Sequence, residues 1–322
     1  MNNNRWTWGH TAALMVITLA VVGYAMFPLF LKQKEPSGNI TTWIIMAVLL
    51  ALFMAVVGLG VNGRVWGILI DEANTMSLSR FQMVLWTLVI LPGWLAAAVW
   101  NLGIAPQSGQ TLGPLDIAMP AQVWALLGIS TASLVGTPLI LNEKAKRATT
   151  EKQKRRSVQG IARREGKTAQ LERAVAATTP VTAPAPAVAG QPPQAAVPAD
   201  TYTDVAAQSI GVDITRGQLF ARTEPQLAKA SDMFHGDELG NAQQVDLSKI
   251  QMFFFTLILV LAYTLAIQTA LTVGFDPKIP VTTFGVHQFP SIDPGMAALL
   301  AISHAGYLGY KASTHTESPG NQ

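Results

Sequence analysis

The sequence predicts an all-α membrane protein, a polytopic bundle of about six transmembrane helices that contains two parallel helical-hairpin repeats. Composition is the first reason. Half of the 322 residues belong to the hydrophobic set and only 13% are charged, whereas soluble domains carry about a quarter charged residues. The mean hydropathy is +0.31. Lipid is therefore the expected solvent for much of the chain.

Apolar runs of membrane length are the second reason. A hydrocarbon core about 30 Å thick is crossed by roughly 20 apolar residues in a helix. Runs of nearly that length occur at Thr11 to Leu31, Thr41 to Gly60, Phe81 to Trp100, Pro120 to Leu141, Ile250 to Leu271 and Pro294 to Tyr310. The last run is the weakest, because Ser303, His304 and three glycines dilute it.

The distribution of basic residues predicts the orientation. Fifteen of the 22 Lys and Arg residues lie between Lys144 and Lys249, and such residues collect on the cytoplasmic side of a membrane. Threading six spans from this assignment places both termini in the cytoplasm. The compact loops and an alanine and proline-rich linker favour a bacterial inner membrane, with the chain as a multi-pass protein of the cell membrane.

The chain divides into segments by composition. We expect an N-terminal transmembrane pair, two transmembrane hairpin repeats A and B, and a long cytoplasmic loop made of a basic helix, a disordered Pro/Ala-rich linker and a further cytoplasmic segment. The segments are 1–63 for the pair, 64–142 for repeat A, 143–178 for the basic helix, 179–199 for the linker, 200–232 for the cytoplasmic segment, 233–314 for repeat B and 315–322 for the C-terminal tail.

The long loop is not expected to build a substantial core of its own. Its linker holds six prolines among alanines and valines, a composition that does not bury apolar surface. The residues that follow have few large apolar side chains, chiefly Phe220, Met233 and Phe234, and so small a set supplies little burial. We therefore expect short helices that lean on the membrane domain.

Self-similarity predicts the repeats. Six identities recur without gaps at a shift of 169 residues, where Leu78, Ser79, Gln82, Met83, Thr87 and Leu88 match Leu247, Ser248, Gln251, Met252, Thr256 and Leu257. The segment from Ala125 also resembles the segment from Ala298. Both copies enter the membrane from the same side, so an axis along the membrane normal should relate them.

The start of each repeat suggests two local roles. Ser79 and Gln82 have the spacing of a capping box, which would satisfy amide donors at the first turn of a helix; their counterparts have the same spacing. Arg80 and Lys249 stand between them, and we expect both to be interfacial anchors whose long side chains reach the lipid phosphates.

Polar residues inside the predicted spans are the candidate functional residues. His304 is the one ionisable residue placed well inside a span, and such residues are functional hypotheses by default. The structural interpretation is a neutral histidine that is hydrogen-bonded to a carbonyl, to Ser130 or to Ser303. The functional interpretation is a proton relay. Gln82 and Gln251 complete the set, either as hydrogen-bonding contacts between helices or as the lining of a conduit.

The basic stretch after the fourth span is expected to bind lipid. Each Lys or Arg near an anionic membrane surface contributes about 1 kcal/mol, which favours anionic lipid head groups over nucleic acid as the partner. The residues of this predicted lipid-binding segment are Lys144, Lys146, Arg147, Lys152, Lys154, Arg155, Arg156, Arg163 and Arg164.

Acidic residues precede both repeat helices, where Asp71 and Glu72 align with the segment that holds Asp237 and Glu238. A cation site is one interpretation, and docking of the two segments against each other is the favoured one. Cysteine is absent, which excludes thiolate chemistry. No catalytic motif stands at the spacing that chemistry requires, so we expect no enzyme, no cofactor and no metal.

The leading hypothesis is a non-catalytic membrane scaffold, anchor or signalling component that acts through its cytoplasmic loop. A cytoplasmic protein, the bilayer itself and a second copy of the chain are the partners that this hypothesis admits. The rival is a channel or small-solute pore on the pseudo-twofold axis of the repeats.

Overall fold

The computed structural model describes residues 6–31, 37–108, 113, 115–178, 199–272 and 285–319. The described chain is mostly helical and has one two-stranded sheet. It divides into two compact units. Unit 1 comprises Met1–Ile70, Ser77–Thr137 and Ser248–Tyr310, and unit 2 comprises Asp71–Met76, Pro138–Leu247 and Lys311–Gln322.

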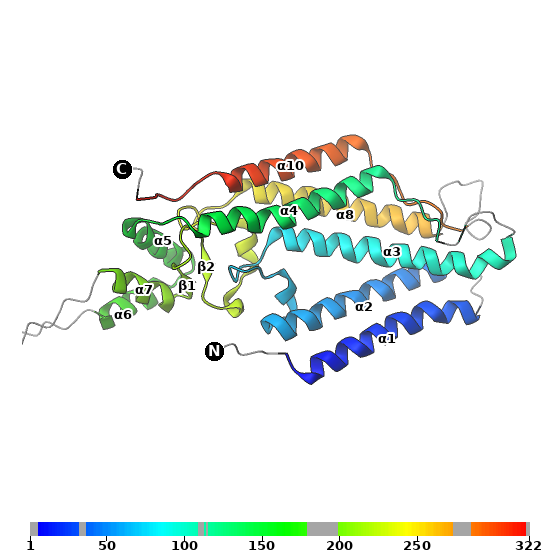
Figure 1. The fold of residues 1–322 in the computed structure, drawn as a ribbon, viewed down its shortest axis with the longest axis horizontal. Coiled ribbons are helices and arrows are strands. Elements are labelled where there is room, and N and C mark those ends of the chain that lie inside the picture. Colours follow the sequence, from blue (N-terminus) through cyan, green and yellow to red (C-terminus); the bar gives the residue numbers. More distant parts are fainter. Residues whose placement is uncertain are drawn as a thin grey trace, which may run out of the picture. The chain divides into compact units, whose positions relative to one another are not determined.

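Long helices make up most of unit 1. They are α1 (Trp8–Leu31), α2 (Ser37–Asn62), α3 (Leu78–Ser108), the greater part of α4 (Ala121–Ala145), α8 (Leu247–Thr272) and the greater part of α10 (Pro294–Ala312). A short 3-10 helix, η1 (Val65–Leu69), joins α2 to α3. The long helices run side by side (Figure 1).

Within the part of the chain that the structure describes, five helices are long and apolar enough to cross a membrane. The spans are Trp8–Met26, Asn39–Asn62, Leu78–Gly103, Ala121–Ala145 and Leu247–Thr272. The first five predicted runs fall within or overlap these helices, which indicates a multi-pass membrane protein. The sixth run forms a helix, α10, but it is not among the five, so the count of six stays a prediction.

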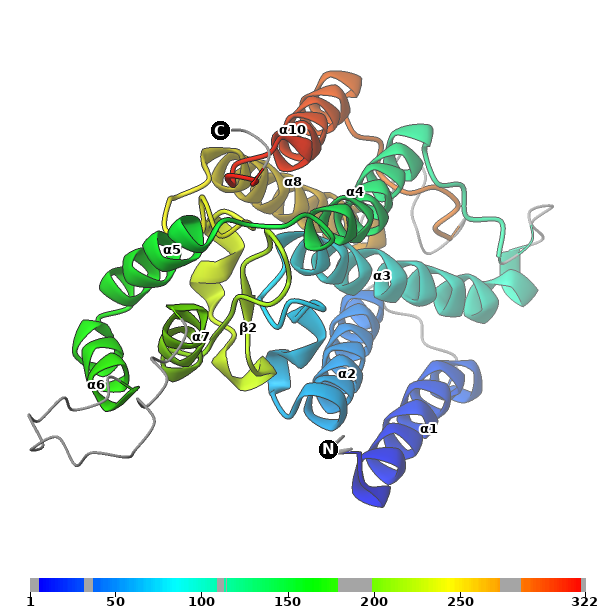
Figure 2. The ribbon, with the colours of Figure 1, turned by 60° about the vertical axis from the view of Figure 1, so that its left-hand side comes forward.

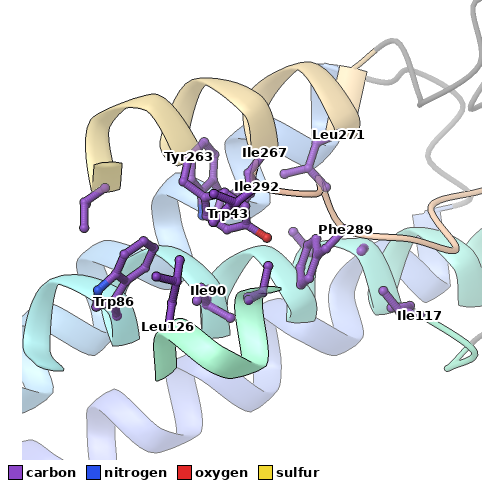
Figure 3. Packing of buried hydrophobic residues seen from close by; sticks show 14 of the residues in the cluster. Trp43, Trp86, Ile90, Ile117, Leu126, Tyr263, Ile267, Leu271, Phe289 and Ile292 are labelled. Atoms are coloured by element: carbon purple, nitrogen blue, oxygen red, sulfur yellow. The ribbon is translucent and has the colours of Figure 1, made fainter. Parts of the chain in front are cut away.

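The core of unit 1 is aromatic and aliphatic. Trp86, Leu126 and Phe289 are fully buried, and they come from α3, from α4 and from the segment before α10. Figure 3 shows this cluster, in which α8 contributes Tyr263 and Ile267. Gly93 lies against it, since a methyl group there would come within 3.4 Å of Ile267.

The loop between α4 and α8 is a folded unit, which corrects the expectation that it would lack a core. Twelve buried apolar residues form one cluster, and α5 (Glu151–Arg164), α6 (Thr168–Thr178), α7 (Ala199–Ser209) and the sheet all contribute to it. Val158 and Ile161 come from α5 and Phe220 from the segment beside the sheet. Burial of these residues stabilises the unit. The sequence argument underestimated this stabilisation because it counted only large apolar side chains.

The sheet and two 3-10 helices complete unit 2. Strand β1 (Val212–Asp213) pairs antiparallel with β2 (Ala221–Arg222), so that Val212 faces Arg222. The helices η2 (Pro225–Leu227) and η3 (Ala230–Phe234) follow. The expectation of short helices between residues 200 and 232 is thus incomplete, because strands occur there as well. The linker predicted at 179–199 lies almost wholly outside the described residues.

The basic segment predicted at 143–178 is not one helix. Helix α4 ends at Ala145, and α5 begins after Thr150, whose hydroxyl accepts a hydrogen bond from the Gln153 amide at 3.2 Å. Helix α5 ends before Gly166, which has a φ of +68°, a conformation that glycine adopts at little cost. This N-cap and this terminal glycine divide the segment, and Figure 2 shows α5 and α6 as separate helices.

The C-terminal tail is docked on unit 2. Its residues from Ser313 to Ser318 exchange hydrogen bonds with side chains or amides of Lys144, Arg147, Gln218, Glu238 and Gly240. A methyl group on Gly240 would fall 1.9 Å from the His315 carbonyl oxygen. Glycine at position 240 therefore permits the close approach of the two backbones.

The docked tail generates a prediction about Gly240. The Gly240→Ala substitution should displace the tail and expose Lys311, which is only 6% exposed. Trypsin should then remove a C-terminal tag by cleavage after Lys311 at least tenfold faster. Gly160→Ala is the matched control, since its methyl group meets only the flexible Gln243 side chain. Equal cleavage of Gly240→Ala and the native protein would contradict the account of the tail.

Candidate functional site

A buried glutamine links two long helices of unit 1. Gln82 of α3 is fully buried, and its Nε2 donates to the Thr256 hydroxyl of α8 at 2.7 Å. The same nitrogen lies 3.4 Å from the Met252 carbonyl oxygen. Gln82 therefore joins helices and does not close a capping box. Its repeat counterpart Gln251 is exposed, which corrects the expectation that both glutamines lie in the interior.

A chain of hydroxyl groups crosses three helices close to Gln82. Ser79 Oγ of α3 lies 3.4 Å from Thr137 Oγ1 of α4, which lies 3.4 Å from the Tyr307 hydroxyl of α10. All three residues are buried. Sequence reasoning assigned Ser79 to a cap and missed Thr137 and Tyr307. The spacing of Ser130, Ser133 and Thr137 at i, i+3 and i+7 could have indicated one polar helix face.

His304 is buried and bonded to an unexpected partner. Its Nδ1 lies 2.5 Å from Ser133 Oγ, and the residue is 2% exposed. Ser130 and Ser303, which were the expected partners, are both buried, but neither hydroxyl has a hydrogen-bond partner among the described residues. The structure therefore brings Ser133 to His304 in their place.

The two predicted interfacial anchors differ in burial. Lys249 is only 3% exposed, within α8, so its side chain does not reach outward from the helix as expected. Arg80 of α3 is partly exposed, and its role as an anchor stays a prediction. The matched pair thus occupies two different environments.

A buried arginine organises unit 2. Arg222 is fully buried, and its Nε and Nη2 donate to the two Asp232 carboxylate oxygens at 2.9 and 2.6 Å. Its Nη2 also lies 2.9 Å from Glu165 Oε1, and its guanidinium carbon lies 5.4 Å from the centre of the Phe220 ring. A bidentate pair of this kind gives both energy and orientation. Sequence reasoning missed this network entirely.

Glu165 is the second carboxylate of that network. Burial alone would raise the pKa of Glu165, but hydrogen bonds from Lys229 and Arg222 outweigh it and lower the pKa to about 2. Two of the ion pairs, to Arg222 at 2.9 Å and to Lys229 at 2.7 Å, involve different oxygens. Glu165 is therefore charged across the physiological range, and it neutralises a cation that water cannot reach.

Lys144 is buried, which removes it from the predicted lipid-binding segment. Its ammonium lies 2.5 Å from Glu238 Oε1 and donates to the Ser313 carbonyl oxygen. Burial would raise the pKa of Glu238, but the hydrogen bonds from Lys144 and His315 outweigh it and lower that pKa. A buried ammonium must be paired, and this pairing ties the end of α4 to the tail.

The other basic residues of the segment differ in exposure. Lys154 pairs with Glu151 at 2.6 Å, and Arg164 is partly buried with its guanidinium carbon 5.9 Å from the Phe220 ring centre. The remaining residues are exposed, and we call them the basic face: Lys146, Arg147, Lys152, Arg155, Arg156 and Arg163. Their acidic neighbours include Glu143 and Glu317, which pair with Lys146 and Arg156 at 2.7 and 3.8 Å.

The two acidic segments meet in unit 2, as the docking interpretation expected. Asp71 and Asp237 line the same small cavity. Burial and then the nearby Asp237 raise the pKa of Asp71, although hydrogen bonds from Thr75 and the charge of Lys311 oppose that rise. Asp237 pairs with Lys311 at 3.0 Å. Among the residues that the structure describes, no group of three or more His, Asp or Glu side chains is placed to hold a metal ion.

Comparison of the chain with protein-family models, with curated proteins and with solved structures found no match. The function is therefore inferred from the contacts within the two units.

The Arg222 network generates a prediction about pH. The pKa of Glu165 is depressed below its ordinary 4.5, so its contribution to stability is full above pH 4.5 and is lost as the pH falls towards 2. Susceptibility of unit 2 to pepsin, normalised to an unfolded substrate, should rise steeply in that window. It should rise less in Glu165→Gln, which has already lost the charged pair.

At pH 7 the same substitution should destabilise unit 2 by about 3 kcal/mol, because it leaves Arg222 partly uncompensated. Native-state trypsin cleavage measures the loss. Glu317→Gln is the control, since that carboxylate is exposed and its pair with Arg156 is long. Equal behaviour of the two variants would show that the network does not stabilise unit 2.

Proposed function

We propose that the protein is a multi-pass membrane scaffold that anchors a folded cytoplasmic module, unit 2, and acts through it without catalysis. This proposal rests on one observation. The long loop folds around its own apolar cluster, and the side chains of the basic face are exposed to solvent. A module that organises its buried charges in ion pairs and displays cations to its surroundings is suited to binding. No cofactor is part of the proposal.

Anionic lipid head groups are the first partner of the basic face. Six exposed Lys and Arg residues follow closely after a membrane span, where each contributes about 1 kcal/mol of attraction to an anionic surface. The same surface would hold the module in a fixed orientation for a cytoplasmic protein partner. Binding of nucleic acid is not proposed, and self-association of the bundle is compatible with the scaffold.

Duplication of the hairpin is part of the proposal. Helices α3 and α8 begin at the aligned residues Leu78 and Leu247. Before α3 the amides of Asp71 and Ser77 donate to the carbonyls of Thr75 and Leu69, and before α8 those of Gly236 and Asp246 donate to Gln244 and Phe234. The same hydrogen-bonded turn thus precedes both helices, with four extra residues in the second copy. These parallels support two repeats, and the four extra residues place a gap in the alignment before the helices, where the ungapped match from Leu78 and Leu247 has not yet begun.

The alternative is a channel or small-solute pore on the pseudo-twofold axis. Such a pore would place Gln82 and Gln251 at equivalent interior positions. Gln82 is fully buried and bonded to Thr256, whereas Gln251 is exposed. The two copies therefore differ at the positions that would line a symmetric conduit, and this difference favours the scaffold.

The basic face provides the test. Replacement of Lys152, Arg155, Arg156 and Arg163 by Gln should reduce the anionic lipid that copurifies with the protein at least tenfold, measured by native mass spectrometry. Recovery of crosslinked soluble partners from native membranes should fall in parallel. The matched control exchanges Lys for Arg and Arg for Lys at the same four positions and keeps the charge. Unchanged lipid and partner recovery in the Gln variant would refute the proposed role of the face.

A further inference from the structure

Buried side chains that carry polar groups form a seam within unit 1. On α4 the seam comprises Ser130, Ser133 and Thr137, and on α10 it comprises Ser303, His304 and Tyr307. Helix α3 adds Ser79, Gln82 and Trp86, and helix α8 adds Thr256 and Tyr263. All eleven residues are buried, and their spacing on α3 and α4 is i, i+3 and i+7, so each set occupies one helix face.

Hydrogen bonds join the four helices along this seam. Ser79, Thr137 and Tyr307 form one chain, and His304 bonds to Ser133. Gln82 bonds to Thr256, and the rings of Trp86 and Tyr263 meet edge to face with centroids 6.0 Å apart. On α3, α4 and α10 the members of different pairs are three or four residues apart, so these pairs follow one another along the helices.

Six polar atoms of the seam are buried without a hydrogen-bond partner among the described residues. They are Gln82 Oε1, Trp86 Nε1, Ser130 Oγ, Tyr263 Oη, Ser303 Oγ and His304 Nε2. An unsatisfied buried donor or acceptor costs about 1–3 kcal/mol, so six of them together are a large penalty. Each such group in a native protein calls for a specific explanation.

Other buried polar side chains of unit 1 that the structure describes have partners within the protein. Asn39 donates to the Leu271 carbonyl at 3.0 Å, and the Trp43 indole donates to the Val89 carbonyl at 3.1 Å. Asn101 exchanges two hydrogen bonds with the Val286 backbone, at 2.9 and 2.8 Å. Within the described part of unit 1, the buried side-chain atoms without a partner all belong to the seam, whereas Gln218 Oε1 and Arg222 Nη1 of unit 2 also lack one.

The seam is blind. Seven residues separate Ser130 from Thr137 on α4, which corresponds to about 10 Å along a helix and to about a third of the hydrocarbon thickness. Deeper along the same helices lie Val123, Leu126 and Leu300, which are almost fully buried and apolar. A polar path along α4 and α10 can thus lead inward from the start of α3, and it stops at this layer.

The chemistry of the six atoms selects the ligand. The indole of Trp86 can only donate, the amide oxygen of Gln82 can only accept, and the three hydroxyl groups can do both. An anion would require donors, and a cation would require acceptors. Water satisfies a mixture of the two, and buried waters typically make about three hydrogen bonds to such groups.

We propose that the seam binds a short chain of water molecules, which enters where α3 begins and ends at His304. The water chain gives each of the six buried atoms a hydrogen-bond partner. Water reaches Nε2 of His304 only from the end of the bundle where α3 begins. His304 exchanges its ring proton with water through this path. The bundle thus contains a one-sided hydrated inlet, a property that the scaffold role does not require.

Radiolytic hydroxyl-radical footprinting of the native full-length protein in lipid nanodiscs tests this proposal. Radicals formed from bound water oxidise the side chains that contact it, and a scavenger in bulk water does not suppress this reaction. Trp86, Tyr263 and His304 should be oxidised at least threefold faster than Trp43 and Phe289, which are also buried. Trp43 is the matched control for Trp86, because its indole is already bonded to a carbonyl.

Trp124 reports radicals that arrive from outside, since it is exposed on α4 within a membrane span. Preferential, scavenger-resistant oxidation of Trp86, Tyr263 and His304 would support the inlet. Oxidation of these residues at the rate of Trp43, or labelling that the scavenger abolishes, would overturn it and show that the seam is dry.

Discussion

The need to pair buried polar groups governs the interior of this protein. A charge taken out of water must find a partner or it destabilises the fold by several kcal/mol. Arg222 meets this requirement through Asp232 and Glu165, and Lys144 meets it through Glu238. Since Glu165 and Glu238 are far from their partners in sequence, the pairs define how the chain of unit 2 must return on itself.

Buried polar groups must also be paired in unit 1, whose surroundings are apolar. Its helices satisfy their own backbones, and its core is packed with aromatic and aliphatic side chains. The polar groups that it buries are mostly neutral, which lowers the cost of placing them among hydrocarbon. Some of them bond across helices, as Gln82 does to Thr256. Others lack a protein partner among the described residues, and they mark the place where water belongs.

The two units divide the work that the proposed function requires. A bundle of apolar helices fixes the chain in the membrane, while a separately cored module presents cations to its surroundings. The division falls within α4 at Pro138, where a proline removes one backbone hydrogen bond of the helix. The tail from Lys311 onward belongs to unit 2, so the module is assembled from three stretches of the chain.

The spans could be predicted from the sequence because hydropathy is a local property, and five of the six runs meet the criterion for crossing a membrane. Unit 2 could not be predicted as a folded module, because its apolar residues are small and scattered. Val158 and Ile161 stand among the arginines and lysines of α5, and only their i, i+3 spacing marks a buried face.

Partners distant in sequence account for the other errors. Lys144 resembles its exposed neighbours until Glu238 is placed beside it. Gln82 and Gln251 are identical residues at aligned positions, yet one is buried and the other exposed. The set of polar residues around His304 was predicted in part, since Ser130, Ser303 and Gln82 do lie in the seam. Its actual bonding partner Ser133 required the packing of α4 against α10 to be known.

The chain between α4 and α8 forms a folded module around its own apolar cluster. Hydrogen–deuterium exchange of the full-length protein in lipid nanodiscs tests it most directly. The residues Val158, Ile161, Ala162, Ile210, Val212 and Ile214 belong to the core of unit 2, and exchange of their amides should be slowed at least a thousandfold relative to an unfolded chain. Exchange of these amides at the unfolded rate, with the spans still protected, would contradict the claim.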